Sequence, residues 1–142
     1  MVTHTHSDAV AGERNVNTPV AFAFGAVFVL LGVTGCLVAG SHHVVGPQGS
    51  ELLGVFQVNI LLNVVHLGSG TALVAAGILG TRQARLANTA VGLGFLALFV
   101  IGLAVIGTAA NFLALNSADN ALHLALGAAL TAVGRGADRV PR

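Results

Sequence analysis

The chain has 142 residues, of which 55% are hydrophobic and only 8% are charged, with a formal net charge of +1. A soluble domain carries about 25% charged residues, so the composition indicates helices that lie in a lipid bilayer. The low net charge excludes the basic face that nucleic-acid binding requires, and the single cysteine excludes an internal disulfide framework.

The charge-poor part of the chain extends over residues 18–134, between polar tails at 1–17 and 135–142. The first tail is polar and mixed in charge, and we expect it to be disordered. The apolar run from Val20 to Ala39 is about 30 Å long as a helix, which equals the thickness of the hydrocarbon core. Together the apolar runs predict four membrane helices, at about 19–40, 52–80, 89–110 and 117–135.

The first predicted helix contains Val33-Thr34-Gly35-Cys36, which is similar to a bacterial lipoprotein cleavage box. Cleavage there would remove the helix and attach a lipid to Cys36. The preceding segment is long and weakly basic for a signal sequence. We therefore interpret Cys36 as a small buried residue of a membrane helix.

The arginines are distributed unevenly around the four helices. All six fall in the first tail, in the connection between helices two and three, or in the last tail. Cytoplasmic segments carry the excess of Lys and Arg, so we expect both termini in the cytoplasm of a multi-pass inner-membrane protein, with His42 and His43 outside. The arginines are Arg14, Arg82, Arg85, Arg135, Arg139 and Arg142.

An Asn-x3-Asn-x2-His pattern occurs twice, 57 residues apart, first ending at His66 and then at His123. Asn and His are scarce in this chain, so the pattern indicates an internal duplication. The two copies fall on helices two and four, which run in the same direction. The halves should therefore be related by an axis along the membrane normal, giving an all-α four-helix bundle of two helical hairpins.

The repeated polar residues are candidates for a buried cluster. Each trio has the spacing i, i+4, i+7, which places it on one helix face, and polar side chains at membrane depth need partners inside the protein. We expect the six side chains to satisfy one another and to align helices two and four: Asn59, Asn63, His66, Asn116, Asn120 and His123. Small residues would let these backbones approach, namely Gly68, Ala72, Ala76, Gly80, Ala125 and Ala129.

Asp119 is the one charged residue inside the repeated region, and it is an additional candidate ligand or proton partner. Two histidines are fewer than the three or four ligands that zinc takes, so a metal would need Asp119, His42 or His43 as well. Haem could use the same two histidines, but no basic residue lies near them to bind its propionates. Intramembrane histidines can also relay protons. We assign no metal or cofactor.

The helix-two motif Asn59-x3-Asn63-x2-His66-Leu67-x2-Gly70, and its copy ending at Gly127, resemble a family of small four-helix membrane proteins found mainly in actinobacteria. That family is catalogued only as a domain of unknown function. The resemblance extends over residues 20–134. Leu62 stands where we expect a further histidine in the family. The resemblance implies an integral membrane protein and supplies no activity.

The chain contains no paired carboxylates, Ser-His-Asp spacing, P-loop or GxGxxG motif. We therefore predict a non-catalytic protein, an accessory or scaffold subunit that packs against itself or a larger complex in the membrane. The alternative is binding or transport of a small ligand, metal, haem or proton through the Asn/His cluster between helices two and four.

Overall fold

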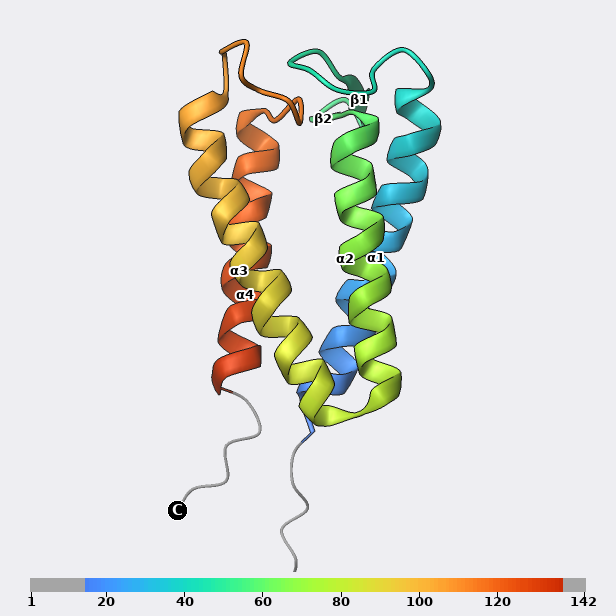
Figure 1. The fold of residues 1–142 in the computed structure, drawn as a ribbon, viewed down its shortest axis with the longest axis vertical. Helices are drawn as coiled ribbons and strands as arrows, with labels where there is room; N and C mark the ends of the chain where they lie inside the picture. Colours follow the sequence, from blue (N-terminus) through green and yellow to red (C-terminus); the bar gives the residue numbers. More distant parts are fainter. Residues whose placement is uncertain (1–14, 137–142) are drawn as a thin grey trace, which may run out of the picture.

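The computed structural model describes residues 15–136, which form four helices and one short β-hairpin (Figure 1). The helices are α1 (Asn17–Ala39), α2 (Ile60–Leu79), α3 (Thr81–Val105) and α4 (Ser117–Gly136). The strands are β1 (Ser50–Leu52) and β2 (Phe56–Val58). The prediction of an all-α four-helix bundle is confirmed.

The bundle consists of two antiparallel helical hairpins, α1–α2 and α3–α4, which meet mainly where α3 packs on α1 and α2 (Figure 1). The β-hairpin and the connection 106–116 lie at one end, which we call the loop end. The start of α1, the turn at Gly80 and the end of α4 lie at the other, the turn end. Residues 1–14 and 137–142, which contain most of the two predicted tails, lie outside the described residues.

Helix α2 begins eight residues later than the sequence predicted. Residues 50–58 form the β-hairpin, in which Ser50 pairs with Val58 and Leu52 with Phe56. Leu53 and Gly54 make its turn with positive φ angles of 57° and 68°, which a helix cannot contain. Hydrophobicity alone did not distinguish this apolar hairpin from the helix that follows it.

Helix α3 also differs from its predicted bounds, because it begins at Thr81 and ends at Val105. Gly80 makes the whole turn from α2, with a φ of 114° that favours glycine. The arginines expected in a polar turn at 82–88 therefore lie in the first turns of α3. Long arginine side chains can reach the membrane surface from such positions.

Three of the helices in the described part of the chain are long and apolar enough to cross a membrane: α1, α2 and α3. Helix α4 is not among them. It carries Asp119, Asn120, His123 and Arg135 within 20 residues, and these make it less hydrophobic than the others.

Each hairpin depends on glycines where its two helices touch. A methyl group added at Gly70 of α2 would lie 2.7 Å from the backbone nitrogen of Val29 and 2.8 Å from the carbonyl oxygen of Gly25 in α1. The repeat-equivalent Gly127 of α4 meets the backbone of α3 in the same way, 2.9 Å from the carbonyl oxygen of Gly92. The backbones are therefore in direct contact within each hairpin.

The small residues predicted to join helices two and four do not have that role. A methyl group at Gly68 would meet no atom within 4 Å, and Ala72, Ala125 and Ala129 are exposed. The close partner of α2 is α1, not α4. The buried glycine face is rotated away from the predicted one.

We predict that Gly70→Ala lowers the free energy of unfolding by about 1–3 kcal/mol, because the added methyl group overlaps backbone atoms that cannot rotate away. Gly68→Ala is the matched control on the same helix. It should leave stability unchanged or raise it by up to about 1 kcal/mol, the helix propensity difference. Thermal unfolding in mild detergent measures both, and equal effects would contradict the packing described.

Candidate functional site

Two repeat-equivalent asparagines cap helices and join the halves of the bundle at the loop end. Asn59 Oδ1 accepts a hydrogen bond from Leu62 N (2.8 Å), and its Nδ2 donates to the carbonyl of Phe112 in the other half (2.8 Å). Asn116 Oδ1 accepts from Asp119 N (2.9 Å), and its Nδ2 donates to the carbonyl of Val55 (2.8 Å). Each asparagine thus starts its own helix and holds a loop of the opposite half.

The second pair of asparagines points into the hairpins. Asn63 packs its amide against Gly35 of α1, and Asn120 packs against Gly102 of α3, where any side chain on the glycine would collide with the amide. Both asparagines are buried. The Nδ2 and Oδ1 of Asn63 and the Oδ1 of Asn120 have no protein hydrogen-bond partner.

The two histidines meet in the centre of the bundle beside a pair of stacked phenylalanines. The ring centroids of His66 and His123 are 6.1 Å apart. Phe28 and Phe95 stack at 4.7 Å with an interplanar angle of 11°. Both histidines are buried, and the Nδ1 atom of each has no protein hydrogen-bond partner.

A small cavity, which we call the polar chamber, lies between these histidines and the β-hairpin. Its volume is about 20 Å³, which exceeds the 10–15 Å³ or so that one water molecule needs. Its polar walls are Asn63, His66, Asp119 and His123. Apolar side chains complete it from α1, the β-hairpin and α4: Leu31, Leu52, Phe56, Val58 and Leu122.

The structure brings together four of the seven candidate residues around the chamber and places Asn59, Asn116 and Asn120 elsewhere. The prediction that the six Asn/His side chains bond to one another and align helices two and four is wrong in its hydrogen bonding. No hydrogen bond between these side chains joins α2 and α4 within residues 15–136, because Asn63 and Asn120 turn toward α1 and α3. The described residues also contain no group of three His, Cys, Asp or Glu side chains that could hold a metal ion.

Asp119 links the chamber to the β-hairpin. Its Oδ2 accepts hydrogen bonds from the backbone nitrogens of Gln57 (3.2 Å) and Asn116 (3.0 Å). Both donors are backbone nitrogens, so the carboxyl group is held between the start of α4 and strand β2.

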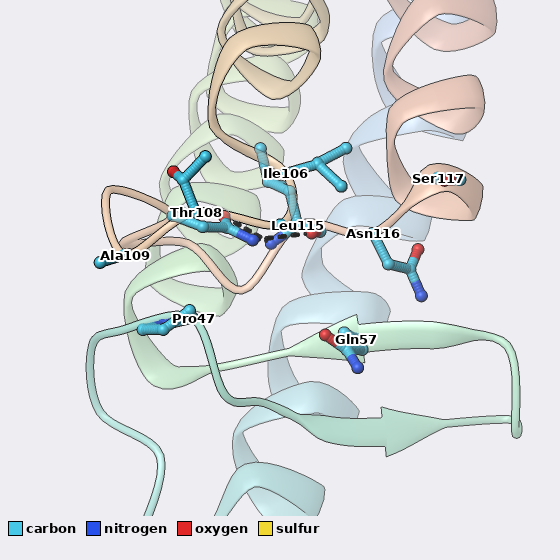
Figure 2. A pocket seen from close by; sticks show the side chains of 10 residues that line it. Pro47, Gln57, Ile106, Thr108, Ala109, Leu115, Asn116 and Ser117 are labelled. Atoms are coloured by element: carbon cyan, nitrogen blue, oxygen red, sulfur yellow. Dashed lines mark hydrogen bonds between the residues drawn. The ribbon is translucent and has the colours of Figure 1, made fainter.

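An open groove of about 440 Å³ lies at the loop end, between the β-hairpin and the connection 106–116. Figure 2 shows Gln57 and Asn116 facing this groove from the strand and from the start of α4. Gln57 lines the groove and its backbone binds Asp119, which lines the chamber. This contact therefore lies between the chamber and the outer surface.

Sequence reasoning missed the stacked phenylalanines and the β-hairpin that covers the chamber. The sequence contains a weak signal for the phenylalanine pair, because three residues of the first helix recur 67 positions later. Gly25, Phe28 and Gly35 correspond to Gly92, Phe95 and Gly102. The duplication thus includes the first helix of each half. Its spacing differs from that of the Asn/His repeat because the first half contains the extra hairpin.

The fold and composition define a helical bundle of the membrane type with a buried polar site. The chain matches the model of a family described as a domain of unknown function, DUF4383, over residues 19–135. It belongs to that family. No curated protein and no solved structure matches it.

We predict that Asn63→Leu, a substitution of nearly equal volume, destabilises the protein by about 1 kcal/mol, because a water molecule in the chamber supplies the hydrogen bonds that no protein group gives this amide. Asn120→Leu is the matched control at the repeat-equivalent position outside the chamber. It should be neutral or stabilising, since it removes a buried unpartnered oxygen. Thermal unfolding of both variants in detergent shows whether each substitution raises or lowers the free energy of unfolding. Stabilisation by Asn63→Leu would show that the chamber amide has no partner.

Proposed function

We propose that this protein is a non-catalytic integral membrane protein that binds a proton in the polar chamber, with access from the loop end. The observation that carries the proposal is the meeting of two imidazoles, a carboxyl group and an unpartnered amide around a cavity of about 20 Å³. Imidazole is the side chain whose ordinary pKa lies near neutral pH, and a carboxyl group can exchange a proton with it through a bridging water molecule.

The size of the chamber favours a proton over the other ligands considered. A cavity with room for about one water molecule suits a proton and its water better than haem, and the described residues bring together too few ligands to favour a metal. One water molecule could connect Asp119 to the imidazoles of His66 and His123. A proton that arrives at the carboxyl group could then reach a ring nitrogen.

The surroundings of the chamber favour binding rather than conduction. On the turn-end side of the imidazoles, the buried core cluster of the described residues is made of alanine, phenylalanine and leucine, with Phe28, Phe95, Leu73 and Leu130 all buried. These four side chains offer no group that could accept a proton from the imidazoles. Buried polar side chains occur again at the turn end, where Asn88 donates hydrogen bonds to Asn17.

A scaffold or accessory subunit is the second candidate, and the exposed side chains of the loop end favour it. Five large apolar residues outside the helices are more than half exposed: Val44, Val45, Leu53, Val55 and Phe112. Exposed apolar patches of this kind commonly mark contacts with other proteins or with membranes. A second copy of the chain or a larger membrane complex could pack there.

We further infer a multi-pass location in the inner membrane with both termini in the cytoplasm. The support is that Arg82, Arg85 and Arg135 gather at the turn end, where α1 also begins and α4 ends. The loop end would then face the outside, and the chamber would respond to external pH.

The test is NMR of the protein with ¹⁵N-labelled histidine in micelles. We expect the ring nitrogens of His66 or His123 to gain a proton as the pH is lowered, with a titration that Asp119→Asn displaces and Asn120→Leu does not. Proteoliposomes with a pH gradient should show no protein-dependent proton flux. Imidazoles that keep one protonation state would exclude the proton site and favour the scaffold, whereas sustained flux would contradict one-sided access.

A further inference from the structure

A second hollow, which we call the arginine groove, lies at the turn end between α3 and α4. Its volume is about 540 Å³, and Arg82, Arg85 and Arg135 line it. The acidic residues within the described part of the chain are Glu51 and Asp119, both at the opposite end. The groove therefore presents three positive charges with no carboxylate partner from residues 15–136.

The floor of the groove is a close contact between helices. Gly134 of α4 is buried against α3, where an added methyl group would lie 2.6 Å from Thr89 N and 3.0 Å from the carbonyl oxygen of Arg85. The Nε of Arg85 donates a hydrogen bond to the carbonyl of Gly134 (3.1 Å). This bond fixes the guanidinium group across the two helices, while its terminal nitrogens can still bind an anion.

One wall of the groove is apolar and follows the membrane direction. Leu86, Ala90 and Leu93 lie on one face of α3, and Leu86 and Leu93 are 62% and 47% exposed. From Leu86 to Leu93 the helix rises roughly 10 Å, and from Arg82 to Leu93 roughly 16 Å, about half of the hydrocarbon thickness. The arginine and the apolar wall together are thus about as long as one leaflet is deep.

We propose that the arginine groove binds one anionic phospholipid. The phosphate lies between the guanidinium groups of Arg82, Arg85 and Arg135, near the positively polarised start of α3. One acyl chain follows Leu86, Ala90 and Leu93 into the leaflet. Charge selects the headgroup and the apolar wall selects a lipid over a free phosphate ion.

The experiment measures thermal unfolding of the full chain in detergent with added phosphatidylglycerol, with phosphatidylcholine of the same acyl chains, or with inorganic phosphate. Phosphatidylglycerol should raise the unfolding temperature saturably, and the other two should not. Arg82→Gln or Arg135→Gln should weaken the apparent affinity for phosphatidylglycerol roughly five-fold, the effect of one basic residue near a lipid surface.

A pair of matched variants distinguishes binding of the lipid in the groove from non-specific attraction between anionic lipid and the arginines. Leu93→Gln and Leu103→Gln make the same change on exposed positions of α3, but only Leu93 lines the groove. Leu93→Gln should weaken binding of phosphatidylglycerol and Leu103→Gln should not. The proposal is overturned if the two variants bind equally well, if phosphatidylcholine stabilises as strongly, or if phosphate alone reproduces the shift.

Discussion

The bundle depends on the crossed hydrogen bonds of Asn59 and Asn116 at the loop end. Each side chain uses its oxygen to start its own helix and its nitrogen to bind a carbonyl of the opposite half. Helix capping of this type is worth about 0.5–2 kcal/mol per residue. The two acceptor carbonyls belong to Val55 and Phe112, which lie in loops at the surface. The two side-chain amides therefore bind four backbone groups, namely two nitrogens and two carbonyl oxygens. These bonds help to fix how the two hairpins face each other.

The polar chamber arises because the two halves are no longer identical. Asp119 occupies the position that Leu62 has in the first half, and Leu62 is fully buried. The β-hairpin exists only in the first half, and its Gln57 binds the carboxyl group of Asp119 in the second. A carboxyl group from one half and a cover from the other therefore meet above the paired imidazoles.

The sequence predicted the four helices and indicated the duplication, because the lengths of apolar runs and the positions of polar residues can be read without three-dimensional information. Of the six repeated Asn/His residues, the structure buries five and leaves Asn116 partly exposed. The sequence did not predict which neighbour each asparagine faces. A spacing of i, i+4, i+7 defines a stripe, but Asn59 caps the helix and binds Phe112, Asn63 turns to Gly35, and His66 meets His123. The β-hairpin was hidden in an apolar run, and the phenylalanine pair recurs at a spacing of 67 residues instead of 57.

The longer connection of the first half has a consequence for the ancestry of the chain. Phe28 precedes His66 by 38 residues, whereas Phe95 precedes His123 by 28. The additional residues include the β-hairpin, and residues 81–136 contain no counterpart of it. The cover of the chamber is therefore a feature in which the two duplicated halves have diverged.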